Sequence, residues 1–295
     1  MDSENDLPGN LFSQCLKCSE RNKTWSIVSF IIYIFDKTYL LTYIRSVMLK
    51  RIAGGIPDFQ RQRTIRRAAL GLGYFAVEVE EHQVGLSANL GHLNAGSCNV
   101  FSQAGQIAGS SVAEILEFSK KTGFLQRSLA LATMNALIKP EIDSLDDDVF
   151  SKVSPAAGER VVMIGLIEPV AKMLSDTGCD VAVFEQRSIE HPLVRESHEM
   201  KILIRDADLL IISATTLINN TLGDILALPR AARDIILMGP STPMMVDAFR
   251  STGITYLAGS RIVDTEKAMT IVMEGGGTQA LYHGGAMKKV VREIV

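Results

Sequence analysis

The sequence predicts an α/β protein in which a doubly wound sheet of parallel strands follows a smaller α+β domain. Apolar strands alternate with helical stretches from about residue 159 onward. Two of these strands, Leu209–Ile212 and Ile235–Met238, end abruptly in loops of small polar residues, SATTLINNT and GPSTP. Runs that end this way are typical of strands buried on both faces of a parallel sheet, whose carboxyl ends carry the ligand sites.

The smaller domain is expected over residues 39–145. Its apolar residues have helical spacing at both ends of this segment and alternate in the middle, as in a hairpin. Ser111 and Glu114 form a capping box that opens the helix after a long polar loop. The predicted elements are helix 39–56, strands 74–80 and 82–86, loop 87–109, helix 111–121 and helix 124–138.

The sheet domain is expected over residues 159–295, after a linker over 146–158 that begins with an acidic cluster. Strands and helices that alternate in this way are joined by right-handed crossovers, which place helices on both faces of the sheet. The predicted strands are 161–164, 181–184, 209–212, 235–238 and 255–257, and the predicted helices are 169–177, 221–228, 244–251 and 264–274.

The composition indicates an ordinary folded protein without a nucleic-acid partner. Of the 295 residues, 47% are hydrophobic and 21% are charged, and the net charge is −3. A nucleic-acid binder normally presents a basic face, which this balance argues against. Four cysteines in a chain of this length do not resemble a disulfide framework, so we expect a reducing, cytoplasmic location.

Residues 1–38 are expected to be an extension outside the main fold, packed on it or on a partner. The apolar run Trp25–Phe35 is well short of the roughly twenty residues that a membrane span needs. Acidic residues near the start and the lack of a small-residue cleavage site argue against a signal peptide. No stable membrane span is therefore expected, with a signal anchor as the alternative.

The first strand of the sheet domain ends at Gly165, in the sequence GLIEP. A dinucleotide-binding loop would carry three glycines, and Glu168 would direct a negative charge at a pyrophosphate, so a standard dinucleotide site is not expected. Glu185 ends the second strand, where an acidic side chain binds ribose hydroxyls in adenosine-binding folds. The alternative is that Glu185 is a solvated strand end.

Hydroxyl and amide side chains follow the third strand, at Thr215, Thr216 and Asn219. Either Asn219 or Asn220 is expected to cap the next helix. The remaining side chains can both donate and accept hydrogen bonds at the crevice, so they are candidate ligand-binding residues.

The GPSTP loop supplies a second set of candidates. Gly239 lets the backbone approach a ligand, and Pro240 restricts the loop. Ser241 and Thr242 are then expected to donate hydrogen bonds to an anion or a metal-bound oxygen. Neither this loop nor SATTLINNT contains His or Cys, so neither resembles a metal cage.

Candidate metal ligands are sparse. His92 and Cys98 share the long loop of the smaller domain, with exposed loop residues as the alternative reading. Cys15 and Cys18 form a lone C-x-x-C motif, whereas zinc fingers need four ligands. No nucleophile elbow, Ser/His/Asp order or paired-carboxylate signature is present, and the sequence leaves open whether the protein is an enzyme.

Helix 124–138 carries a face of small residues, Ser128, Ala132 and Asn135. Such a face suits close packing against a neighbour, with the Asn135 amide able to hydrogen-bond across the contact.

Five segments of the sequence, taken together and in their order along the chain, resemble a two-domain family of unknown function that is named for heavy-metal chelation. The resemblance covers about residues 40–290 and implies an enolase N-terminal-like domain followed by a Rossmann-like domain, with a site in the cleft between them. Carried over onto this sequence, the implied cleft residues are Asn135, Thr216, Asn219, Gly239, Pro240, Thr242 and Gly259. The segments that carry the resemblance are LALATMNAL (129–137), SATTLINNTL (213–222), GPSTPM (239–244), YLAGSRIVD (256–264) and GGG (275–277).

These observations predict binding of a small molecule, a transition-metal ion or a metal chelate in an interdomain cleft. The rival hypothesis is an enzyme that uses an adenosine-containing cofactor, such as S-adenosylmethionine or a nucleotide, with Glu185 on the ribose. A third hypothesis is a structural module that forms a homodimer through the helices of the smaller domain.

Overall fold

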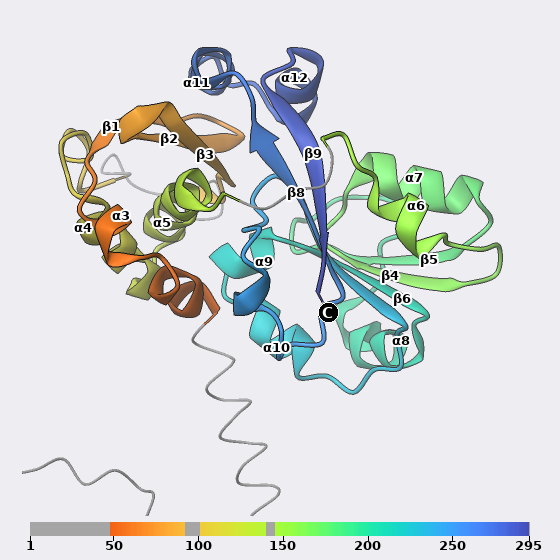
Figure 1. Ribbon diagram of the computed structural model, residues 1–295. Helices are drawn as coiled ribbons and strands as arrows, with labels where there is room; N and C mark the ends of the chain where they lie inside the picture. The colour runs from red at the N-terminus through yellow and green to blue at the C-terminus, as the bar shows by residue number, and fades with distance from the viewer. Residues whose placement is uncertain (1–47, 92–100, 140–144, 295) are drawn as a thin grey trace, which may run out of the picture. The chain divides into compact units, whose positions relative to one another are not determined.

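The computed structural model describes residues 48–91, 101–139 and 145–294 (Figure 1). The predicted α/β class is confirmed, because a six-stranded, mostly parallel sheet follows a three-stranded antiparallel sheet in the chain. The expected extension over 1–38 lies outside the described residues. Within the described segments, no helix combines the length and the apolar character that a membrane crossing requires.

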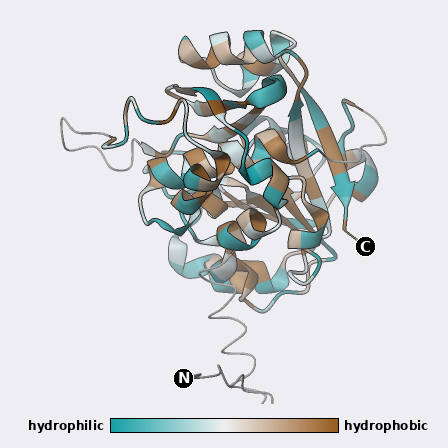
Figure 2. Cartoon of the chain, turned by 60° about the vertical axis from the view of Figure 1, so that its left-hand side comes forward, coloured by the Kyte–Doolittle hydropathy of each residue, from teal (hydrophilic) through white to brown (hydrophobic). Residues whose placement is uncertain are grey.

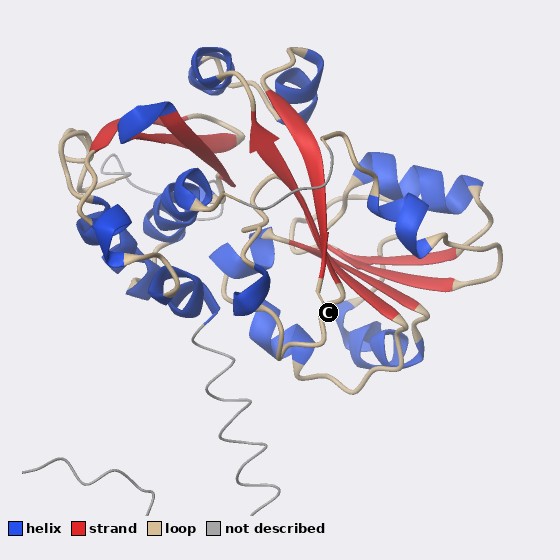
Figure 3. Cartoon of the chain, viewed as in Figure 1, coloured by secondary structure: helices blue, strands red, loops and turns tan. Residues whose placement is uncertain are grey.

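The small sheet and its helices come first in the chain (Figure 3). Their elements are helix 48–54, α3 (Asp58–Arg61), β1 (Ile65–Leu70), β2 (Tyr74–Val79), η1 (Glu80–His82), β3 (Gln83–Ala88), α4 (Val112–Leu116), η3 (Glu117–Lys120) and α5 (Phe124–Leu137). The predicted hairpin is confirmed as the antiparallel pair β2–β3. The capping box is confirmed too: Ser111 Oγ accepts from the Glu114 N–H, and the Glu114 carboxylate accepts from the Ser111 N–H.

Strand β1 is not predicted by the apolar pattern. A bulge between Ile65 and Arg67 shifts its register against β2, which breaks the two-residue period of buried side chains. Arg67 forms an ion pair with Glu78 of β2, whose side chain is only 1% exposed. An ionic contact across the strands therefore takes the place of the alternation that would identify the strand.

Helix α5 lies so close to β3 that a side chain at Gly85 would not fit. A Cβ atom on Gly85 would lie 2.1 Å from Ala136 N and 2.2 Å from Ala132 O. The Asn135 amide donates to Leu86 O at 2.8 Å on the same side of the helix. The small-residue face predicted for this helix is thus used within the chain, against its own sheet.

The large sheet is built from alternating strands and helices. Its elements are β4 (Arg160–Ile164), α7 (Glu168–Asp176), β5 (Asp180–Phe184), η4 (Ser197–Glu199), α8 (Met200–Asp206), β6 (Leu209–Ser213), α9 (Thr215–Ile218), α10 (Leu222–Leu226), β7 (Asp234–Met238), η5 (Val246–Ala248), β8 (Tyr256–Ile262), α11 (Thr265–Met273), α12 (Thr278–His283) and β9 (Met287–Glu293). The strand order is β5-β4-β6-β7-β8-β9, and only β9 is antiparallel to its neighbour.

Both faces of the large sheet are covered, as a parallel sheet requires. Leu210 and Ile212 of β6 belong to a hydrophobic cluster that also contains Phe75 from the small sheet. Leu209 and Ile211 belong to a second cluster on the opposite face. Figure 2 shows hydrophobic residues concentrated along the strands, whereas the helices carry both kinds of residue. The first cluster joins the small sheet and the large sheet through shared apolar contacts.

The helix predicted over 244–251 is wrong, because that segment contains only the 3-10 turn η5. Met244 Sδ approaches the Cβ position of Gly259, whereas Met245 Sδ approaches that of Gly55, each at 2.6 Å. Consecutive side chains that pack on such different neighbours are typical of extended chain rather than of a helix.

Three of the short helices that the pattern does not predict each have a small apolar face. Helix α8 buries only Ile204 and α12 only Leu281. Helix α6 (Val149–Val153) lies within the predicted linker and buries Val149 and Val153. Periodicity over one or two turns is too weak a signal to identify such helices.

Gly85→Ala is expected to lower the free energy of unfolding by about 1–3 kcal/mol, because the new methyl group must push α5 away from β3. Urea denaturation followed by circular dichroism measures the change. Gly54→Ala is the matched control, since a Cβ atom there meets nothing within 4 Å. Equal stability of the two variants would contradict the close approach of α5 to β3.

Candidate functional site

The order of the large sheet creates a crevice between β4 and β6. From β4 the chain adds β5 on one side and then crosses to place β6 on the other side. The connections that leave the carboxyl ends of these strands therefore run to opposite sides of the sheet. In open α/β sheets, ligands bind at this topological switch point.

A cavity of about 950 Å³ lies at this point, and we call it the switch-point cleft. Five of the predicted site residues line it together: Gly165, Glu185, Thr215, Thr216 and Asn219. The small sheet contributes to the wall through its β1–β2 turn and the segment after β3. The full lining is Leu72, Gly73, Asn89, Leu90, Ile164, Gly165, Leu166, Phe184, Glu185, Gln186, Arg187, Arg195, Ser197, Met200, Lys201, Ser213, Thr215, Thr216, Asn219, Thr221, Asp224, Ile225 and Leu228.

Gly165 is required by its backbone conformation and by its neighbour. Its φ is +85°, which L side chains rarely adopt, and a Cβ atom would lie 2.8 Å from Ser213 Cβ. The glycine thus brings the end of β4 close to the end of β6. This close approach forms the floor of the switch-point cleft.

The Glu185 carboxylate is bound mainly within the chain. It accepts hydrogen bonds from the Leu166 N–H at 3.1 Å, the Arg187 N–H at 3.0 Å and the Arg187 guanidinium at 3.0 Å. Burial alone would raise the pKa of Glu185, but these hydrogen bonds outweigh burial and lower it. Leu166 N lies where a phosphate-binding loop would present an amide, so an internal carboxylate already uses that donor.

The residues after β6 are more ordered than the predicted loop. Thr215 and Thr216 lie in helix α9. The Thr216 hydroxyl, on a side chain that is 3% exposed, donates to Ser213 O at 2.7 Å. The Thr215 hydroxyl pairs with Ser213 Oγ at 2.9 Å. Both threonines thus line the cleft while stabilising the turn out of β6.

Asn219 and Asn220 make different hydrogen bonds in the turn between α9 and α10. Asn219 Oδ1 accepts from the Thr221 N–H and hydroxyl, which positions the start of α10, and its amide donates to Gln186 Oε1 at 3.1 Å. Asn220 has a φ of +63° and accepts from Arg127. Asn219 thus holds the turn before α10, and the predicted capping role falls to neither asparagine, because the N-cap of α10 is Thr221 and makes no side-chain cap hydrogen bond.

The sequence reading missed the cations of the switch-point cleft. Arg187, Arg195 and Lys201 line it, and they come from the segment between β5 and the first turn of α8. Their spacing has no motif, because an irregular connection brings them to the cleft. The apolar strand end at Phe184 was the available signal, since residues that follow it belong to the same sheet edge.

Arg127 of α5 joins the small sheet's helices to this edge. Its guanidinium donates to Ile218 O at 2.6 Å, Leu217 O at 2.7 Å and Asn220 Oδ1 at 3.2 Å. The side chain is 8% exposed, and burial lowers the pKa of the guanidinium, although an arginine stays charged. The carbonyls at the end of α9 therefore serve as its acceptors.

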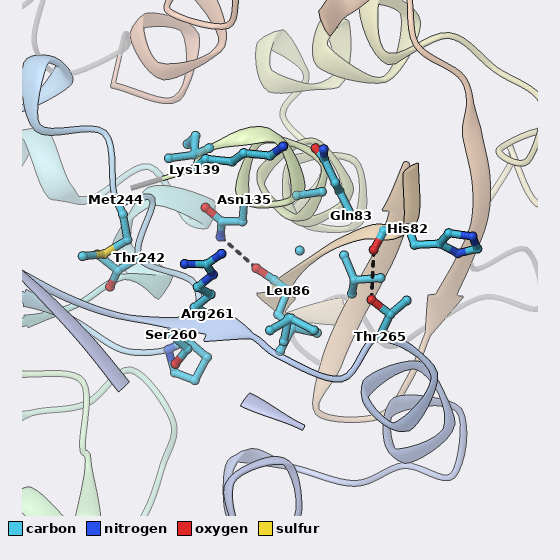
Figure 4. Close-up of a pocket in the computed structure, with 16 residues that line it drawn as sticks. His82, Gln83, Leu86, Asn135, Lys139, Thr242, Met244, Ser260, Arg261 and Thr265 are labelled. Atoms are coloured by element: carbon cyan, nitrogen blue, oxygen red, sulfur yellow. Dashed lines mark hydrogen bonds between the residues drawn. The ribbon is translucent and has the colours of Figure 1, made fainter. Parts of the chain in front are cut away.

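The GPSTP loop does not share the switch-point cleft. Pro240 and Thr242 line a different cavity of about 180 Å³, together with Asn135. We call this cavity the hairpin pocket, since residues of the β2–β3 hairpin form part of its wall. The full lining is His82, Gln83, Val84, Gly85, Leu86, Asn135, Ala136, Ile138, Lys139, Pro240, Thr242, Met244, Ser260, Arg261, Ile262 and Thr265 (Figure 4).

Ser241 and Thr242 do not present free hydroxyls to a ligand, contrary to expectation. Ser241 Oγ accepts from the Ala88 N–H at 2.8 Å, and Thr242 Oγ1 lies 3.3 Å from Ala258 O as a donor. Both side chains are at most 3% exposed. The loop folds inward onto the small sheet, and its hydroxyl groups form hydrogen bonds within the chain.

Gly239 and Gly259 line neither cavity. The φ of Gly239 is +120°, with nothing within 4 Å of its Cβ position, so its backbone conformation favours glycine. A Cβ atom on Gly259 would lie 2.6 Å from Met244 Sδ. Their roles are thus in the shape of the loop and in packing.

Two family models match the chain, and both are described as "Putative heavy-metal chelation". The DUF364 model matches residues 148–291 and the DUF4213 model matches residues 56–138. The chain therefore has a segment similar to the DUF4213 model followed by a segment similar to the DUF364 model. This confirms the resemblance found in the sequence.

Two solved structures have a fold similar to that of this chain. A crystal structure of a protein of unknown function from Desulfitobacterium hafniense has a TM-score of 0.70 at 20% identity, covering 85% of this chain and 98% of the other. One from Pyrococcus horikoshii has a TM-score of 0.72 at 22% identity, covering 84% and 100%. The uncharacterized protein MJ0500 of Methanocaldococcus jannaschii is 26% identical over 196 residues, which are 61% of this chain and 71% of that protein.

The described residues of the protein offer one group of metal-type ligands. Glu78, His82 and Glu266 place ligand atoms within 4.8 Å of one another. Arg67 forms ion pairs with both carboxylates, and Arg66 lies 2.9 Å from the His82 ring. Because two guanidinium groups already supply the positive charge there, this group does not fit a metal ion. The other candidates, His92 and Cys98, lie outside the described residues.

Arg127→Met is expected to lower the free energy of unfolding by about 2–4 kcal/mol, because the α9 carbonyls lose their donors while they stay buried. Arg127→Lys is expected to recover part of the loss. Arg205→Met, which removes an exposed arginine paired with Asp206, is the control and is expected to change stability by less than about 0.5 kcal/mol. Urea denaturation measures the free energy of unfolding of each variant. Equal losses of stability in Arg127→Met and Arg205→Met would refute the role of Arg127 in anchoring α9.

Glu185→Gln is expected to destabilise the protein by about 1–3 kcal/mol at pH 7, because three hydrogen bonds lose their charged acceptor. A lowered pKa means that the contribution is complete above the unfolded-state value of about 4.5 and is lost as pH falls through the folded-state value. The gap between wild type and variant should therefore close in acid. Glu168→Gln, an exposed carboxylate of the same rim, is the control. A gap that persists unchanged at low pH would contradict the assignment.

Proposed function

We propose that the switch-point cleft binds an anionic small molecule, and that a heavy metal enters it as a complex with an organic chelator. The observation that carries the proposal is the lining of the cleft, whose described residues combine cationic side chains with hydroxyl and amide groups and include neither His nor Cys. The description of the two matched models is consistent with a chelated metal.

Charge supports an anion over a bare metal ion. Arg187, Arg195 and Lys201 line the cleft against two carboxylates, Glu185 and Asp224, which leaves a net charge of +1 from three cations and two acids. Arg187 and Glu185 pair at 3.0 Å and neutralise each other. Neither Arg195 nor Lys201 forms an ion pair with a described residue. Like charges repel a free cation here, and soft metals prefer thiolate or imidazole ligands, which the described residues of the wall do not supply.

The size of the cleft supports an organic ligand. Pockets for organic ligands typically have volumes of about 300–1,000 Å³, and this cavity has about 950 Å³. Leu72, Met200 and Leu228 provide apolar surface beside the polar groups. A metal complex with an organic shell and a negative outer charge matches both kinds of wall.

An adenosine-containing cofactor is the second candidate, favoured by the place of Glu185 at the end of the second strand. Its ribose would have to compete with Leu166 and Arg187 for the carboxylate. Thermal-shift measurements with ATP and with S-adenosylmethionine separate the two candidates. A shift that Glu185→Ala abolishes would favour the cofactor.

The test of the proposal is calorimetric titration of the full, tag-free chain with the Ni²⁺–EDTA complex, whose coordination sphere is closed. We expect a Kd tighter than about 1 mM. Lys201→Ala and Arg195→Ala are each expected to weaken binding about ten-fold, the effect of losing one charged contact. Lys172→Ala, an exposed lysine of α7 paired with Asp176, is the matched control.

Bare Ni²⁺ and EDTA alone complete the design. Bare Ni²⁺ is expected to bind no tighter in the wild type than in Lys201→Ala. If bare Ni²⁺ binds more tightly than its EDTA complex, and Lys201→Ala strengthens that binding, the cleft is a cation site and the proposal fails.

A further inference from the structure

The hairpin pocket is separate from the switch-point cleft, since none of the described residues lines both cavities. We propose that the hairpin pocket binds a small anion that also carries a hydroxyl group, a short hydroxycarboxylate or a phosphate monoester. The inference does not depend on what occupies the cleft. It follows from two cations, two buried acceptors and the size of the cavity.

Two cationic side chains line the pocket. Lys139 follows the end of α5, and Arg261 lies on β8 near the edge of the large sheet. Neither forms an ion pair or a hydrogen bond with a described residue. Figure 4 shows the Arg261 guanidinium turned toward Asn135 and the Lys139 ammonium turned toward Gln83. No acidic side chain of the described residues lines the pocket to balance these two charges, so an anion placed between them would relieve their repulsion.

Two side-chain oxygens of the lining residues lack donors. Asn135 Oδ1 and Gln83 Oε1 are buried, and no described group donates to either of them. The Asn135 amide cannot simply be reversed, because its nitrogen donates to Leu86 O at 2.8 Å and to Ser241 O at 3.1 Å. A buried acceptor without a donor costs about 1–3 kcal/mol. A ligand hydroxyl would supply that donor, which a simple carboxylate cannot do.

The volume selects a small ligand. The pocket has about 180 Å³, which is below the roughly 300 Å³ at which pockets for larger organic ligands begin. A nucleotide or a metal chelate is therefore too large, whereas an acid of two to four carbons or a phosphate monoester of similar size is compatible. The two cavities thus differ in the size of ligand that each accepts.

The test uses calorimetric titration of the full chain with four probes: glycerate, propionate, glycerol and inorganic phosphate. We expect glycerate to bind with a Kd tighter than about 1 mM, propionate at least ten-fold more weakly and glycerol not at all. Phosphate distinguishes the two sources of the anion, since tighter binding of phosphate than of glycerate favours a phosphate over a carboxylate as the anionic group of the ligand. Equal affinity for glycerate and propionate would overturn the requirement for a hydroxyl.

Variants locate the binding. Arg261→Ala and Lys139→Ala are each expected to weaken glycerate binding about ten-fold, with unfolding midpoints within 2 °C of the wild type because both side chains are exposed. Arg195→Ala, which alters the switch-point cleft, is expected to leave glycerate affinity within two-fold. If Arg195→Ala removes glycerate binding and Arg261→Ala does not, the anion binds in the cleft and this proposal is wrong.

An internal carboxylate is the rival occupant. Glu141 and Asp143 follow Lys139 in the sequence, outside the described residues. The double variant Glu141→Gln/Asp143→Asn is expected to bind glycerate like the natural chain. If only the double variant binds glycerate, the chain's own acids fill the pocket and the proposal is overturned.

Discussion

The arrangement of the switch-point cleft depends on one buried cation, Arg127. Its guanidinium pairs with no carboxylate among the described residues and is held by two carbonyls at the end of α9 and by the Asn220 side chain. A helix C-terminus carries partial negative charge, so this is a favourable place for a buried guanidinium. Because α9 follows β6 directly, the contact fixes the turn at the carboxyl end of the large sheet against the helix of the small sheet. The walls of the switch-point cleft are thus positioned relative to each other by hydrogen bonds as well as by apolar packing.

A second set of hydrogen bonds explains why the GPSTP loop folds inward. Ala88, at the end of β3, donates through its N–H to Ser241 Oγ and accepts through its carbonyl from Ser128 Oγ. Asn135 donates to Ser241 O from the same helix. The hydroxyls of the loop therefore substitute for the neighbouring strand that the free edge of β3 lacks. Residues that the sequence assigns to ligand binding instead connect the two sheets, and the hairpin pocket lies beside this junction.

The sequence predicts the parallel strands well because each carries a continuous apolar run that both faces of the sheet bury. It also predicts that Gly165, Glu185, Thr215, Thr216 and Asn219 belong to one edge, since parallel strands present their carboxyl ends together. The prediction from sequence fails where a residue distant in the chain determines the local structure. Strand β1 is linked to β2 by the ion pair between Arg67 and Glu78, which the apolar pattern does not reveal. An irregular connection brings Arg195 to the cleft. A periodic pattern reports which side of an element is buried, but it does not report what covers that side. Ser241 is therefore predicted as a ligand contact although its hydroxyl connects the two sheets, and the Asn135 amide nitrogen connects them as well.

The position of Glu185 links the fold to the chemistry of the cleft. In dinucleotide-binding folds, the amides after the first strand bind phosphate, and the acid after the second strand binds ribose. Here the Glu185 carboxylate accepts from the Leu166 N–H. The acid that would bind ribose and the amide that would bind phosphate therefore bind each other instead. Arg187 completes this contact, and its positive charge is then no longer available to a ligand. The attraction for an anion is left to Arg195 and Lys201, which lie farther along the chain on the α8 side. A ligand of the cleft would therefore approach that side rather than the helix α7 where a nucleotide phosphate would bind.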